Sequence, residues 1–91
     1  YLSPEERVQA RCLSQAWKQA RETVAQGCRN SLELLDQAEK TILEAGGQID
    51  YIKIVDSETL ADVDIVDENS RMLMAVKIGN TRLIDNSALL A

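Results

Sequence analysis

The sequence predicts an α+β fold in which an N-terminal helical hairpin packs on a small antiparallel sheet of about three strands. Apolar residues recur at helical spacing up to Gly46 and at every second position after Gly47, so helices give way to strands near the middle of the chain. Gly79-Asn80, between two short apolar runs, is typical of a two-residue β-hairpin turn. We therefore expect a single domain over residues 1–91.

The first helix is expected over residues 4–26. Ser3 suits the N-cap, Pro4 the first helical position and Glu6 the third, and this arrangement forms a capping box. Gly27 is expected to end the helix in the left-handed conformation. The predicted buried stripe consists of Val8, Cys12, Leu13, Ala16, Trp17, Ala20 and Val24.

The second helix is expected to begin at Asn30-Ser31 and to stop at Gly46-Gly47. The short link between the helices predicts an antiparallel hairpin. The glycine pair follows a helix and precedes a strand, which favours a helix C-cap over a phosphate-binding loop. The predicted apolar stripe consists of Leu32, Leu35, Ala38, Ile42 and Ala45.

Three strands follow. In the first, over residues 49–56, strict alternation places Ile49, Tyr51, Lys53 and Val55 on one face and Asp50, Ile52, Ile54 and Asp56 on the other. Because both faces carry apolar residues, this strand is predicted to be central or covered. Residues 57–71 are expected to form an irregular acidic loop, and residues 72–78 and 81–85 a hairpin.

Composition excludes several classes of function. Hydrophobic residues make up 45% of the chain, as in globular domains, and histidine is absent, which excludes Ser-His-Asp triads and histidine metal sites within this chain. The net charge is −5, with 4 basic and 8 acidic residues after Gly47, so nucleic-acid binding is not expected. No apolar run approaches membrane-spanning length, so no membrane contact is expected.

Two groups of residues are candidates for chemistry. The acidic stretch from Asp56 to Glu68 lacks the glycine of a calcium-binding loop, so a solvated loop is expected and no metal site is assigned. Lys53 and Lys77 would suit a cross-strand cluster that meets a phosphate, but a solvated face with pairing to Asp50 and Asp85 is the more usual arrangement. Cys12 and Cys28 are expected to be reduced, as in a cytoplasmic protein, with Cys12 buried.

Three segments, taken together, resemble the C-terminal domain of the pantoate–beta-alanine ligase (pantothenate synthetase) family. They are Tyr-Leu-Ser-Pro-Glu-Glu-Arg at residues 1–7, Ile-Asp-Tyr-Ile-Lys-Ile-Val-Asp at residues 49–56 with Glu-Thr-Leu at residues 58–60, and Gly-Asn-Thr-Arg-Leu-Ile-Asp-Asn at residues 79–86. The resemblance covers essentially the whole chain. Together with a start at Tyr1 rather than Met, it predicts a piece of a longer protein.

The resemblance implies a function for the longer protein. This family is similar to the nucleotidylyltransferases. It condenses pantoate with beta-alanine in pantothenate and coenzyme A biosynthesis, using ATP and Mg²⁺, through a pantoyl adenylate that releases AMP and pyrophosphate. Its Rossmann-like N-terminal domain carries the histidine-containing nucleotide motif, and a Ser-Ser-Arg-Asn motif lies at the domain junction. Neither motif occurs in this chain, so no catalytic residue is assigned here and the fragment alone is expected to be inactive and to bind no cofactor.

The resemblance further implies a cytoplasmic, homodimeric full-length enzyme in which this domain is a lid on the N-terminal domain. A lid excludes water from the adenylate, and Lys53, Lys77 and Arg82 are the residues expected to face the substrates on closure. A stand-alone interaction module that pairs through the strand edge at residues 81–86 is the alternative function. An independent small enzyme is disfavoured, because the chain lacks a nucleotide loop and histidine.

Overall fold

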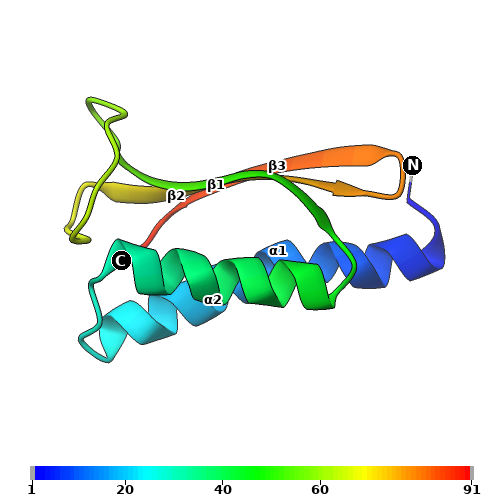
Figure 1. Ribbon diagram of the computed structural model, residues 1–91, viewed down its shortest axis with the longest axis horizontal. Helices are drawn as coiled ribbons and strands as arrows, with labels where there is room; N and C mark the ends of the chain where they lie inside the picture. The colour runs from blue at the N-terminus through cyan, green and yellow to red at the C-terminus, as the bar shows by residue number, and fades with distance from the viewer. Residues whose placement is uncertain (1, 91) are drawn as a thin grey trace.

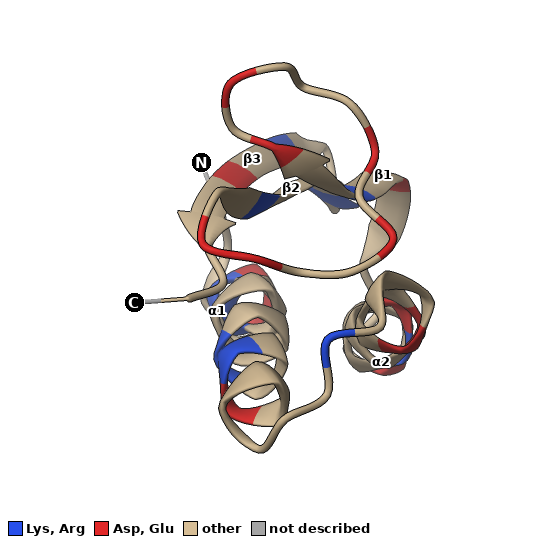
Figure 2. Ribbon diagram, turned by 90° about the vertical axis from the view of Figure 1, so that its left-hand side faces the viewer, with Lys and Arg blue, Asp and Glu red and all other residues tan. Residues whose placement is uncertain are grey.

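The computed structural model describes residues 2–90, which form two layers. Two antiparallel helices lie on one face of a three-stranded antiparallel sheet, as predicted (Figure 1). Viewed along the layers, both helices lie beneath the sheet, and no helix of residues 2–90 lies on the opposite face (Figure 2). The elements are α1 (Pro4–Ala25), α2 (Ser31–Glu44), β1 (Gln48–Asp56), β2 (Ser70–Ile78) and β3 (Thr81–Ala88). Neither described helix has the length and hydrophobicity needed to cross a membrane.

The predicted capping box starts α1. The Glu6 amide donates to Ser3 Oγ at 3.1 Å, and the Ser3 amide donates to Glu6 Oε1 at 2.9 Å. These bonds satisfy amide groups that have no partner within the helix. Gly27, with φ +104°, follows the helix in the left-handed region, also as predicted.

The buried face of α1 is narrower than predicted, and that of α2 includes Leu34, which the predicted stripe left out. On α1 the stripe narrows to Cys12, Leu13, Ala16, Ala20 and Val24, while Val8 is 62% exposed. On α2 the buried apolar residues are Leu34, Ala38 and Ile42, so the prediction that Leu32 belongs to the core was wrong. Residues at intervals of four follow the line of contact with α1 and the sheet, and Leu32 lies to one side of that line.

Polar side chains link the two helices beside this contact. Thr41 donates to Gln19 Oε1 at 2.7 Å, and Thr23 donates to Gln37 Oε1 at 3.1 Å. The Trp17 indole N–H donates to the Ala88 carbonyl at 3.3 Å and so ties α1 to β3. Both cysteines are free and Cys12 is buried, as expected, and burial raises the pKa of its thiol.

The sheet order is β1-β2-β3, so β2 is central and β1 is an edge strand. The prediction of a central β1 was therefore wrong, whereas α2 covers one of its faces. A bulge between Ile49 and Tyr51 also breaks the predicted alternation. As a result Ile49 packs against the core, as Ile52 does, instead of sharing a face with Tyr51.

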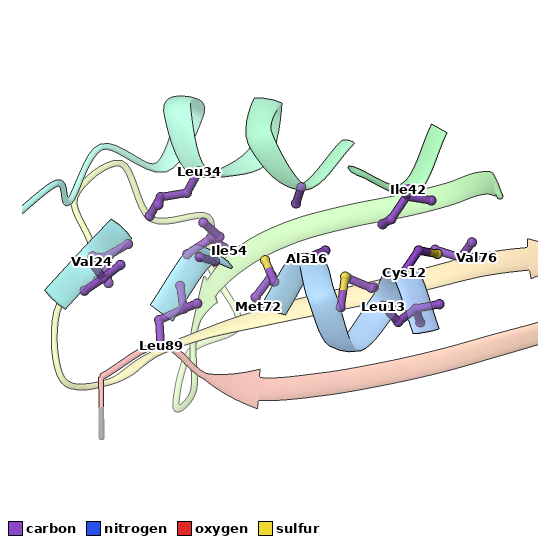
Figure 3. Close-up of a cluster of buried hydrophobic side chains, with 14 of the residues drawn as sticks. Cys12, Leu13, Ala16, Val24, Leu34, Ile42, Ile54, Met72, Val76 and Leu89 are labelled. Carbon is purple, nitrogen blue, oxygen red and sulfur yellow. The ribbon is translucent and has the colours of Figure 1, made fainter. Parts of the chain in front are cut away.

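The core lies between the layers (Figure 3). From β2 it takes the alternate residues Met72, Met74, Val76 and Ile78, each at most 1% exposed. From the loop before β2 it takes Val66, whose amide donates to the Arg29 carbonyl at 2.9 Å. This loop segment therefore covers one end of the core, at the link between the two helices.

Leu34→Ala is expected to lower the free energy of unfolding by about 2–5 kcal/mol, because it leaves a cavity at a residue with 0% exposure. The matched control is Leu32→Ala in the same helix, at a side chain that is 77% exposed, where a change under about 0.5 kcal/mol is expected. Urea denaturation followed by circular dichroism measures both. Equal losses for the two variants would contradict the burial assigned to α2.

The β2–β3 turn packs on the cap of α1. Gly79 has φ +58°, and a Cβ there would overlap the Glu6 carboxylate. Gly79→Ala is therefore expected to cost about 2 kcal/mol, part from the left-handed backbone and part from displacement of Glu6. In a Glu6→Ala background the same change should cost only the backbone part, and a double-mutant cycle by thermal denaturation measures the difference. If Gly79→Ala lowers the free energy of unfolding equally in both backgrounds, the contact is disproved.

Candidate functional site

The uncovered face of the sheet carries a pair of cations at one corner. The register sets Lys77 of β2 opposite Arg82 of β3, and residues opposite one another in a ladder share a face. Lys77 alternates with the buried Val76 and Ile78, so it lies on the face away from the helices. Both cationic side chains are exposed. The hairpin therefore places a lysine and an arginine side by side at this position.

Arg82 is restrained by an ion pair, whereas Lys77 makes no ion pair with any described residue. Arg82 Nη2 and Nε lie 2.8 and 3.0 Å from Oδ2 of Asp50, the residue at the bulge of β1. Both partners are about half exposed, so solvent screening limits the strength of this pair. Its main effect is to orient the guanidinium group beside Lys77.

A shallow pocket of about 190 Å³ lies at this position, and we name it the Lys77–Arg82 corner. Its lining residues are Gln48, Ile49, Asp50, Lys77 and Arg82. Ammonium and guanidinium groups each donate several hydrogen bonds and carry a positive charge. The corner is therefore suited to contact an anion.

Lys53 does not belong to this corner. It lies opposite Leu73, four residues along β2 from Lys77, or roughly 13 Å at the usual rise of a strand. The Lys53–Lys77 cross-strand cluster, which the sequence allowed but did not favour, therefore does not form. Lys53 instead lines a separate pocket of about 240 Å³, together with Ser31 and Asp62 among others. The structure thus brings together two of the three predicted substrate-facing residues.

Gln48 and Ile49 also line the corner, and no pattern in the sequence predicted this. Their contribution depends on the bulge, which the alternation of residue types does not reveal. Asp50 was considered a partner for the basic residues, and it pairs with Arg82. Arg71, the remaining base after Gly47, donates to Asn86 Oδ1 at 2.9 Å, away from the corner.

Two carboxylates of the acidic stretch, those of Asp56 and Asp67, hold turns. Asp56 Oδ1 accepts from the amides of Glu58 and Thr59 at 2.8 and 3.1 Å. The Thr59 amide, followed by that of Glu58, lowers the pKa of Asp56. Asp67 Oδ1 accepts from the Asn69 amide at 2.9 Å in the same way. Within residues 2–90 no group of three possible metal ligands comes together.

Comparison with known proteins places the chain in a family. The family model for Pantoate-beta-alanine ligase matches residues 1–88. Pantothenate synthetase of Syntrophotalea carbinolica is 48% identical over 91 residues, and that of Desulfatibacillum aliphaticivorans is 44% identical over 90 residues. These matches cover 99% and 98% of this chain, respectively, but only 32% of each relative.

A solved structure agrees with these matches. The crystal structure of pantothenate synthetase from Thermus thermophilus superposes on all of this chain with a TM-score of 0.90 and 33% identity, and the match covers 33% of that protein. The chain thus spans about a third of the length of the relatives it matches. The sequence and the fold lead to one conclusion: this chain belongs to the pantoate–beta-alanine ligase family.

Proposed function

We propose that this chain is the C-terminal domain of a pantothenate synthetase and acts as a lid over the active site of the rest of the enzyme. The observation that carries the proposal is the match of the whole chain to about a third of each relative. The reaction proposed for the full-length enzyme is the ATP-dependent condensation of pantoate with beta-alanine through a pantoyl adenylate, which releases AMP and pyrophosphate.

A lid suits this chemistry for a physical reason. An acyl adenylate is a mixed anhydride that water hydrolyses, so a domain that closes over it protects it until the amine attacks. A lid must move as a rigid body. The capping box at Ser3 and the contact of Gly79 with Glu6 stiffen the start of this domain, so bending is expected before Ser3.

The Lys77–Arg82 corner is the part of the domain that we propose to meet the nucleotide phosphates. It lies near the β2–β3 turn, at the same end of the molecule as the start of α1 (Figure 1). A segment joined before Ser3 would therefore arrive beside it. Lys77 has no competing ion pair with the described residues, which supports it over Arg82 as the mobile contact. Lys53 lies outside the corner and is the weakest of the three candidates.

Other parts of the proposal concern the rest of the polypeptide. We assign the catalytic residues, the ATP site and the Mg²⁺ that accompanies ATP to a Rossmann-like N-terminal domain, and the full-length enzyme to a cytoplasmic homodimer. This chain is proposed to supply positive charge and to exclude solvent.

Removal of charge at the corner tests its role. In the full-length enzyme, Lys77→Gln and Arg82→Gln are each expected to lower kcat about ten- to a hundredfold, because each removes a charge-assisted contact of about 1.5–3 kcal/mol to an anion. Lys18→Gln, at an exposed position of α1, is the matched control and should leave kcat unchanged. Steady-state kinetics with ATP, pantoate and beta-alanine measure these effects. Unchanged turnover for both corner variants and for Lys53→Gln would rule out the substrate-facing role.

The isolated 91-residue chain is expected to fold but to release no AMP from ATP, pantoate and beta-alanine. Circular dichroism checks folding, and a coupled AMP assay checks turnover. Ligase activity of the pure chain would overturn the lid assignment. A concentration-dependent dimer seen by light scattering and abolished by a proline in β3 would support the alternative module, because β3 is an edge strand.

A further inference from the structure

An open apolar groove runs between α2 and the edge strand β1. It has a volume of about 640 Å³, and its apolar lining consists of Leu32, Leu35, Leu43, Ile49 and Ile52. We name it the α2–β1 groove. Leu32 is 77% exposed and Leu43 is 53% exposed. Large apolar side chains gathered beside a strand edge are typical of a surface that binds another polypeptide.

The groove continues past Leu32 into the pocket beside Lys53, because the two share Leu32, Leu35 and Ile52. This second part is also lined by Ser31, which is 3% exposed and whose Oγ has no hydrogen-bond partner within residues 2–90. A buried hydroxyl without a partner is unusual in a folded domain. A bound segment that reached it with a donor or acceptor would satisfy it.

The rim of the groove is acidic. Asp36 and Glu39 line its first part, and Asp62 and Asp64 line its second. These four exposed carboxylates are opposed by two lysines. Lys53 lines the second part, and Lys40 Nζ lies 3.3 Å from Asp36 Oδ2. The excess of negative charge favours an occupant that carries lysine or arginine beside its apolar residues.

The edge of β1 beside the groove is open. The strand pairs with β2 on one side, and on the other only its last part is covered, where the Val63 amide donates to Ile54 and the Asp56 amide donates to Ala61. Residues 48–53 therefore have one edge without a strand partner among the described residues. An extended segment can hydrogen-bond to such an edge while its side chains fill the groove.

We infer that the α2–β1 groove is the docking site for the remaining two thirds of a full-length polypeptide, through a segment of apolar residues flanked by lysine or arginine. The inference rests on the proposed function, because it takes the occupant to be the part of the relatives that this chain does not cover. A second copy of this chain is disfavoured, since a two-fold contact at the groove would bring acidic rim against acidic rim.

Position supports an occupant from the same polypeptide. The end of α2 and the start of β1 lie at the same end of the molecule as the start of α1, where a preceding region would join (Figure 1). A tethered partner is present at high effective concentration, so a groove of modest area is sufficient. Ile49 lines both the groove and the Lys77–Arg82 corner, so docking here would bring the corner to the margin of the interface.

Cysteine labelling tests the inference. In a Cys28→Ser background, where Cys12 is buried, Leu32→Cys, Leu43→Cys and the control Ser14→Cys are made in the 91-residue chain and in the full-length enzyme. Ser14 is exposed on α1, so its variant should react with a maleimide at similar rates in both proteins. The two groove variants are expected to react at least tenfold more slowly in the full-length enzyme. Adding Asp36→Asn and Glu39→Gln should restore part of the rate.

Equal rates for the groove variants in the two proteins would overturn the inference. So would protection of Leu32→Cys in the isolated chain that grows with its concentration, because the occupant would then be a second copy. The ligase assay separates this inference from the proposed function. An active full-length enzyme with a freely labelled groove refutes only the docking site, whereas a protected groove in a protein without ligase activity refutes only the proposed reaction. Circular dichroism of each variant confirms that it is folded.

Discussion

The burial of one side of β2 is the constraint on which the rest of the structure depends. Its alternate side chains enter the space beneath the sheet, where the small side chains Ala16 and Ala20 of α1 leave room for them. With β2 fixed in this way, its two neighbours become edges, and the residues between its buried positions must lie on the uncovered face. Lys77 is one of these residues, so the position of the candidate site follows from core packing.

The elements were predictable because their signals are local. Ser3 and Glu6 define the start of α1, and Gly27, Gly46 and Gly79 interrupt regular structure through left-handed backbone conformations. Strand order and facing were not predictable in the same way. A single bulged residue near Asp50 shifts every earlier side chain of β1 to the other face, and residue types alone do not reveal where a bulge occurs.

The candidate site, like the fold, was predictable only where local signals determine it. A two-residue turn fixes the register of its hairpin, so the pairing of Lys77 with Arg82 follows from Gly79-Asn80. The loop that joins β1 to β2 is long and leaves the register of those strands open, so the sequence could not decide whether Lys53 lies opposite Lys77. Leu32 of α2 was assigned to the apolar stripe for a related reason: helical periodicity identifies an apolar face, not how much of that face a neighbour covers.

The contact between Gly79 and Glu6 has a mechanical consequence. Glu6 belongs to the cap that starts the first helix, and Gly79 belongs to the turn that carries Lys77 and Arg82 on its two arms. The chain where it enters α1 is therefore joined to the hairpin by this contact as well as by the packing of α1 on β2 and β3, without the long acidic loop. Because these contacts lie at both ends of α1, we expect the helix and the cationic hairpin to move as one rigid body.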